Sequence, residues 1–175
     1  MRLSEYQKAA WKTAIYPKKG KNPIYPILGF CGEAGELLEK IEQFENPSEK
    51  SSNKDAGPII KELGDVCWYI MAIASEFGVK VTSYTSRGND EGKIINAIRI
   101  VQGACWMAEK AKKLMRDKQY IPPIIVQVSI SVGFEKASQI AKNYGTTLGR
   151  VLGMNIRKLK SRQKRGKLRG SGDNR

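Results

Sequence analysis

The sequence predicts an all-α protein, a helical bundle without a sheet. Apolar residues recur at helical spacing in six stretches, and proline, glycine or polar runs separate these stretches. Residues 124–132 alternate in the manner of a strand, but the chain offers no second strand to pair with them, so we expect helix there too. The expected helices are residues 5–15, 26–43, 58–77, 91–116, 124–143 and 148–163.

The first three helices have recognisable ends. Ser4 is suited to cap the first helix, and Pro17 ends it. Pro26 opens the second helix and Pro58 the third, where Gly78 provides the stop. The inner face of the first helix is expected to hold Tyr6, Ala10, Trp11 and Ala14.

The second half of the chain predicts another helical hairpin, residues 91–144. Its first helix has an apolar stripe that should face the core: Ile94, Ile95, Ile98, Val101, Ala104, Cys105, Ala108 and Leu114. Tyr144 and Gly145 end the hairpin, and Thr147 caps the last helix. The rhythm of this hairpin resembles that of residues 31–78, which suggests an internal pseudo-repeat.

Two of the helices each carry a pair of carboxylates spaced i, i+3. The pairs are Glu33 with Glu36 and Glu62 with Asp65. This spacing puts both members on one helical face, and the apolar neighbours mark that face as buried. A single pair is usually a solvated surface, but four acids facing a core require a positive partner. Oxygen ligands favour Mg²⁺ or Mn²⁺.

Glycines lie inside the same two helical patterns. Each of Gly32, Gly35 and Gly64 weakens a helix by about 1 kcal/mol relative to alanine. Such glycines are expected to admit a close neighbour, either another helix or a ligand.

Composition excludes several classes of protein. Histidine is absent, which removes Ser-His and Cys-His nucleophiles and the usual zinc sites. Cys31, Cys67 and Cys105 are widely spaced in apolar patterns and are expected to be reduced core residues. No apolar run approaches the roughly 20 residues of a membrane span, and the N-terminus has no signal-peptide core. We therefore expect a cytoplasmic protein.

The segments GEAGELLEKI and KELGDVCWYI resemble the MazG-like, all-α nucleoside triphosphate pyrophosphohydrolases, which are related to dimeric dUTPases and dCTP pyrophosphatases. The family signature is a Glu-x-x-Glu helix, a linker and a Glu-x-x-Asp helix. The resemblance covers residues 1–78, and residues 155–175 are similar to the end of phage and bacterial members. It implies a MazG-like bundle into which residues 91–144 are inserted as a second hairpin.

The resemblance implies hydrolysis of a (d)NTP to the (d)NMP and diphosphate, for control or cleaning of the nucleotide pool. Glu33, Glu36, Glu62 and Asp65 would hold Mg²⁺, with Glu36 or Glu33 as an alternative base. By the same resemblance, Tyr69 contacts the nucleotide, while Gln7 and Trp11 border the nucleobase pocket. Ordinary packing or surface roles are the alternatives for these three residues.

The end of the chain is strongly basic. Asn155, Lys158 and Arg162 share one helical face, and the resemblance implies that it contacts phosphate. We expect one domain, residues 1–163, followed by a flexible basic tail, residues 164–175. With a net charge of +14, a helical nucleic-acid-binding protein is the rival interpretation.

The resemblance also implies a homodimer, because shorter family members build their site at a dimer interface. The internal pseudo-repeat would instead allow a monomer.

Overall fold

The computed structural model describes residues 1–46, 55–84 and 88–168. Within these ranges the chain forms helices and no strands, so the expected all-α fold is confirmed. Residues 124–132 are helical, as expected. The helices are α1 (Leu3–Thr13), α2 (Ile24–Glu45), α3 (Gly57–Glu76), α4 (Lys93–Asp117), α5 (Pro123–Asn143) and α6 (Leu148–Lys164).

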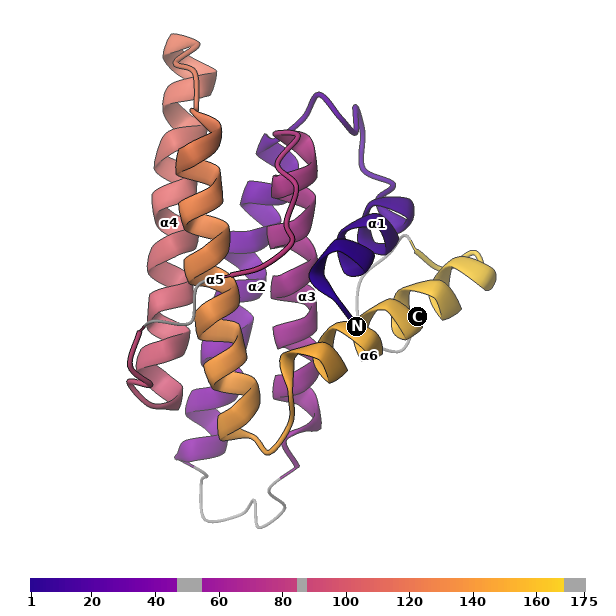
Figure 1. Cartoon of the computed structure of the whole chain (residues 1–175), viewed down its shortest axis with the longest axis vertical. Coiled ribbons are helices and arrows are strands. Elements are labelled where there is room, and N and C mark those ends of the chain that lie inside the picture. Colours follow the sequence, from indigo (N-terminus) through magenta and orange to yellow (C-terminus); the bar gives the residue numbers. More distant parts are fainter. Residues whose placement is uncertain (47–54, 85–87, 169–175) are drawn as a thin grey trace.

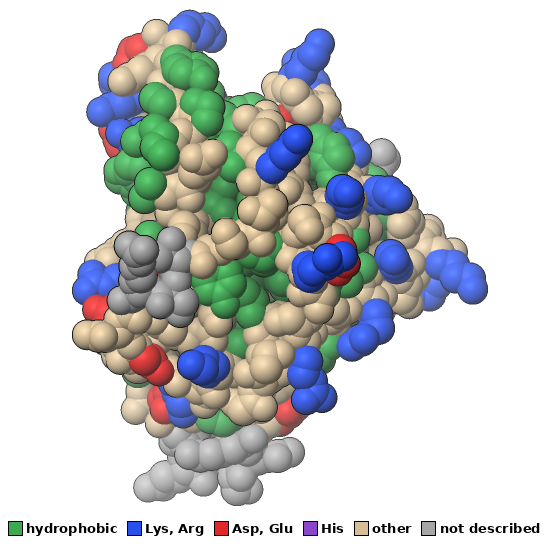
Figure 2. Space-filling model, viewed as in Figure 1, with side chains coloured by type: hydrophobic (Ala, Val, Ile, Leu, Met, Phe, Trp, Pro, Cys, Tyr) green, Lys and Arg blue, Asp and Glu red, His purple; other side chains and the backbone are tan. Residues whose placement is uncertain are grey.

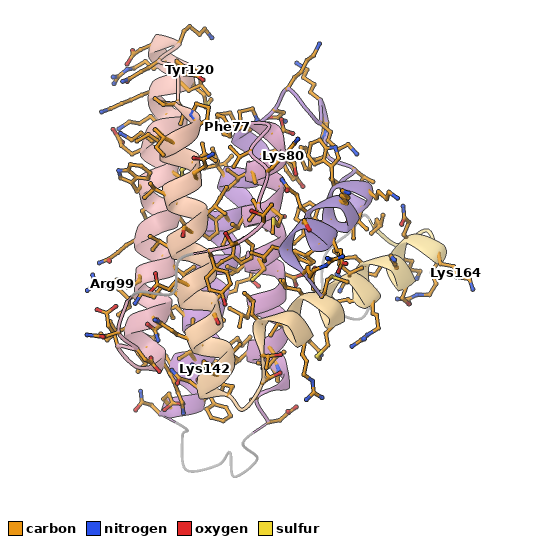
Figure 3. The ribbon with its side chains drawn as sticks, viewed as in Figure 1. Phe77, Lys80, Arg99, Tyr120, Lys142 and Lys164 are labelled. Atoms are coloured by element: carbon orange, nitrogen blue, oxygen red, sulfur yellow. The ribbon has the colours of Figure 1, made fainter. Side chains whose placement is uncertain are left out.

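Helices α2 to α5 form a bundle, and α1 and α6 lie across one side of it (Figure 1). Helix α3 is central because it packs against α1, α2, α5 and α6. Twelve of its 20 residues are buried, which requires the near-continuous apolar pattern seen after residue 58. The α4–α5 hairpin packs along α2 and α3, and Tyr120 marks its tip (Figure 3).

Several helix ends follow the predicted signals, but Pro26 does not open the second helix as expected, because α2 begins at Ile24 with Pro23 at its N-cap. The Thr147 side chain accepts a hydrogen bond from the amide of Arg150, and Gly78 and Gly145 have φ angles of +66° and +68°. The cap at Ser4 was predicted wrongly, because the helix begins at Leu3. The Glu5 carboxylate accepts from the backbone amide of Arg2 (3.1 Å) and from its guanidinium, and this pairing moves the helix start upstream.

The buried face of α4 differs from the predicted stripe. Its buried residues are Asn96, Ala97, Ile100, Ala104, Met107 and Ala111, whereas Ile95 and Cys105 are exposed. Two apolar stripes compete on this helix, and the one rich in small residues allows α4 to approach α2 closely. The other two cysteines fit the expectation better, since Cys67 is buried and Cys31 half-buried.

The structure describes only part of the region around the expected boundary between the domain and its basic tail. Helix α6 ends at Lys164, close to the predicted boundary, and residues 169–175 of the predicted tail lie outside the described residues. In the described part of the chain, no helix combines the length and apolarity needed to cross a membrane.

Candidate functional site

Three of the four predicted carboxylates converge between α2 and α3. Glu33 comes from α2, and Glu62 and Asp65 come from α3; one oxygen of each lies within 4.8 Å of the others. The i, i+3 spacing places both α3 acids on the face that meets α2. Glu62 is only 7% exposed, and the other two are half-buried. Such a group of oxygens is suited to a divalent cation.

Glu36 is the exception, because its side chain is exposed. The buried line of α2 passes through Ala34, Leu37 and Ile41, and Glu36 lies to the side of this line. The expectation that all four acids face the core is therefore wrong for Glu36. The residue is still close enough to Glu33 for the two carboxylates to repel each other.

The electrostatics of the cluster are concentrated at Glu33. Burial, followed by repulsion from Asp65, Glu36 and Glu62, raises the pKa of Glu33 from about 4.5 to about 8, although the nearby ammonium of Lys158 acts in the opposite direction. At neutral pH, the cluster without a cation therefore favours a proton on Glu33.

Helix α6 brings two of the predicted phosphate contacts to this cluster. The Asn155 side-chain amide donates to Oδ1 of Asp65 at 2.8 Å, and the Lys158 ammonium donates to Oδ2 of the same carboxylate. Arg162, on the same face of α6, is also buried. The shared face predicted for these three residues is thus turned inward, and Asn155 and Lys158 on it reach α3.

Tyr6 of α1 joins this network, and its part was not predicted. Its hydroxyl lies 2.9 Å from Oδ1 of Asn155 and 3.3 Å from the carbonyl oxygen of Gly64. The side chain is 0% exposed, and burial raises the pKa of Tyr6 well above its ordinary value, so the hydroxyl remains a donor. The sequence analysis placed Tyr6 in the core but gave it no part in the site. The only signal for such a part was the hydroxyl group itself, because phenylalanine would pack equally well at a purely apolar position.

The glycines of α2 and α3 have different surroundings. A Cβ on Gly64 would lie 3.0 Å from Cβ of Asn155, so the close approach expected for this glycine is confirmed. Among the described residues, no atom lies within 4 Å of such a Cβ on Gly32 or Gly35, so no described helix approaches either glycine closely. Gly29 instead receives the ring of Tyr69, which a Cβ would meet at 2.1 Å.

Tyr69 lies one turn after Asp65 in an aromatic group. Its ring packs edge-on against Trp68, with 4.9 Å between the centroids. Trp68 also contacts Tyr16 and donates from Nε1 to the Thr13 hydroxyl at 3.0 Å. The structure thus puts Tyr69 near the carboxylates but seats its ring on α2.

Gln7 and Trp11 lie elsewhere. The Gln7 amide donates to the Val79 carbonyl (2.7 Å) and accepts from the Val81 amide (3.0 Å), so it holds the segment after α3. That segment begins more than ten residues beyond Asp65, or roughly 15 Å along a helix. Trp11 contacts Tyr16 edge-on and lies under the Lys19 ammonium. Neither residue is brought to the carboxylate cluster.

Comparison with known proteins agrees with this geometry. Residues 26–85, which contain α2 and α3 with their carboxylates, match the MazG nucleotide pyrophosphohydrolase domain. The chain is 30% identical over 112 residues to the Gene 37 protein of Mycobacterium phage L5, covering 59% of this chain and 96% of that relative. The chain belongs to the MazG-like family. No solved structure matches it.

Members of the MazG-like family are nucleotide pyrophosphohydrolases, which are hydrolases that act on acid anhydrides. The matched segment supplies all the acids of the cluster, whereas Tyr6, Asn155 and Lys158 come from helices outside it. Side chains of α1 and α6 therefore extend the hydrogen-bond network that begins at the acids of the matched segment.

Proposed function

We propose that this MazG-like protein hydrolyses a (d)NTP to the (d)NMP and diphosphate. The proposed reaction requires Mg²⁺, and Mn²⁺ is the alternative cation. The observation that carries the proposal is the convergence of oxygens from Glu33, Glu62 and Asp65 within 4.8 Å, beside the Lys158 ammonium. Carboxylates are suited to hold a divalent cation, and a lysine is suited to a phosphate.

In this proposal, Glu33, Glu62 and Asp65 hold the cation, and Glu36 supplies a fourth carboxylate from the solvent side. A bound Mg²⁺ ion supplies Lewis-acid polarisation of the phosphoryl oxygens and lowers the pKa of a bound water. One carboxylate acts as the base instead of as a pure ligand, and Glu36 or Glu33 is proposed to accept the proton of the attacking water. The partial burial of the cluster strengthens each of these electrostatic interactions.

Substrate phosphates are assigned to the inward face of α6. Lys158 pairs with Asp65 in the structure, and a cation on the carboxylates would compete for that oxygen. The freed ammonium would then lie beside the cation, where phosphate oxygens are expected, with Asn155 and Arg162 on the same face. Tyr69 is proposed to contact the nucleotide, whereas contacts of Gln7 and Trp11 with the base stay predictions.

The decisive experiment measures diphosphate release from a panel of NTPs and dNTPs with Mg²⁺, Mn²⁺ or EDTA. We expect metal-dependent release by the wild type and a loss of more than about 100-fold in Glu33→Gln and Asp65→Asn. Glu36→Gln tests whether the exposed carboxylate of Glu36 contributes to diphosphate release. Glu39→Gln is the matched control, because Glu39 is exposed on the same helix and bonds Gln43.

No release from any nucleotide by folded protein with metal present would overturn the proposed reaction. Full activity in both Glu33→Gln and Asp65→Asn would overturn the proposed site. None of the comparisons supports the rival interpretation of a non-enzymatic nucleic-acid-binding protein.

We also propose that the enzyme is a homodimer. Ile124, Val128 and Val132 form an exposed stripe on α5, and residues 119–134 contain no charged residue. Two copies of a chain with a net charge of +14 repel each other, and contact through a face without charged residues brings the fewest like charges together. Light scattering of the protein in solution tests this, and the mass of a monomer at every concentration would contradict it.

A further inference from the structure

A buried chain of hydrogen bonds connects α1, α6 and α3 at the carboxylate cluster. Tyr6 donates to Asn155, and Asn155 donates to Asp65, over distances of 2.9 and 2.8 Å. Tyr6 and Asn155 are only 0% and 3% exposed, so both side chains are almost completely shielded from solvent. Each link therefore depends on the next side chain.

The direction of the donors is fixed by the chemistry at the end of the chain. An ionised Asp65 only accepts, so Asn155 must turn its NH₂ group toward it. The Asn155 carbonyl oxygen then faces Tyr6, whose hydroxyl is the group that donates to it. Without that hydroxyl, the carbonyl oxygen is left buried beside a phenyl ring, and the amide loses the contact that orients it.

The two oxygens of Asp65 have different partners. Oδ1 is held by the amide of Asn155, which is itself fixed by Tyr6 and by the close contact with Gly64. Oδ2 is held by the ammonium at the end of the long Lys158 side chain. One oxygen is thus anchored to the core, while the other has a partner that a cation can replace.

We propose that Tyr6 is a positioning residue that acts through Asn155 to fix the Asp65 carboxylate and thereby sets the affinity of the cluster for a divalent cation. The inference rests on the proposed function, because it assumes that the cluster holds such an ion. It adds a residue of α1 that does not touch the cluster. Partners that orient a metal ligand commonly change metal affinity by 10–100-fold when they are removed.

The test measures Mn²⁺ binding by calorimetry, without nucleotide, in the wild type and in Tyr6→Phe. We expect Tyr6→Phe to bind Mn²⁺ about 10-fold more weakly. The matched control is Tyr84→Phe, which loses a hydroxyl bond to Ser138 on α5 (2.9 Å) and is expected to bind Mn²⁺ like the wild type. Circular dichroism establishes that both variants are folded.

A double variant separates positioning from a general loss of structure. Asn155→Ala should weaken Mn²⁺ binding as well, and adding Tyr6→Phe to it should weaken binding no further, since Tyr6 acts through Asn155. Independent losses that multiply would overturn the inference, and so would Tyr6→Phe with wild-type affinity.

These outcomes are distinguishable from a failure of the proposed function. A wild type that binds no Mn²⁺ would overturn the cation site and this inference together. A wild type that binds Mn²⁺ but releases no diphosphate would overturn only the proposed reaction.

Discussion

At the scale of single residues, Glu33 is the group most sensitive to whether a cation is present. Burial and three neighbouring acids raise its pKa to about 8, and Lys158 offsets only part of this. Because the folded-state pKa is higher than the ordinary 4.5, the folded protein binds this proton more tightly than the unfolded chain does. The free energy of unfolding contributed by this group therefore falls as pH rises from about 4.5 through 8.

Cation binding is accordingly expected to release a proton at neutral pH. A carboxylate that holds Mn²⁺ must be deprotonated, and the pKa of Glu33 without a cation is about 8. Calorimetry at pH 7 in buffers of different ionisation enthalpy should show the release of roughly one proton per site and an affinity that increases toward pH 8. Glu33→Gln should abolish the release, while an unchanged release in that variant would assign it to another group.

The sequence was informative about residues whose roles are set within one or two neighbouring helices. Glu33, Glu62 and Asp65 converge as predicted because i, i+3 spacing and apolar neighbours orient them locally. The exposure of Glu36 was missed, since it depends on the rotation of α2 against α3. Tyr6 was missed because its partner lies 149 positions away and is reached only when α1 packs on α6.

At the scale of elements, the contact between α3 and α6 is what brings Lys158 and Asn155 to the acids. Gly64 allows this contact, because a Cβ there would lie 3.0 Å from Cβ and 3.2 Å from Nδ2 of Asn155. A glycine that weakens its own helix thus permits a close approach at the site.

Gly64→Ala should therefore behave unlike an ordinary helix substitution. Replacing a helical glycine that has open surroundings stabilises a protein by about 0.5–1 kcal/mol, which we expect for Gly103→Ala in α4. In Gly64→Ala the added methyl displaces Asn155, so urea unfolding should show no gain and Mn²⁺ binding should weaken. Equal stabilisation by both substitutions, with unchanged Mn²⁺ binding, would show that α6 can shift away from the added methyl group without loss of stability or affinity.

The existence and approximate limits of the elements could be predicted, because proline, glycine and polar residues mark their ends. The buried face of α4 could not, since its two apolar stripes lie close together and the choice depends on packing against α2 and α5. The packing of α1 and α6 across α3 could not be predicted from the sequence either, because no local sequence signal specifies which helices cross each other.

At the scale of the whole molecule, the strong positive charge favours a polyanionic substrate. The net charge is +14, and Figure 2 shows Lys and Arg side chains gathered where α1 and α6 lie. Lys164, at the outer end of α6, lies on the opposite side of the molecule from the tip of the α4–α5 hairpin (Figure 3). A field of this kind attracts a nucleoside triphosphate before any specific contact forms.

The rate of productive encounter should consequently fall with salt. With Mg²⁺ held constant, raising KCl from about 0.02 to 0.5 M shortens the screening length several-fold, so we expect kcat/KM to fall at least about threefold and kcat to change little. Neutralising two exposed residues of α6, Arg157→Gln with Lys160→Gln, should reduce this dependence. The same change at the far tip, Lys112→Gln with Lys118→Gln, is the control and should leave it nearly unchanged. Equal salt dependence in both double variants would mean that encounter is not steered by the face on which α6 lies.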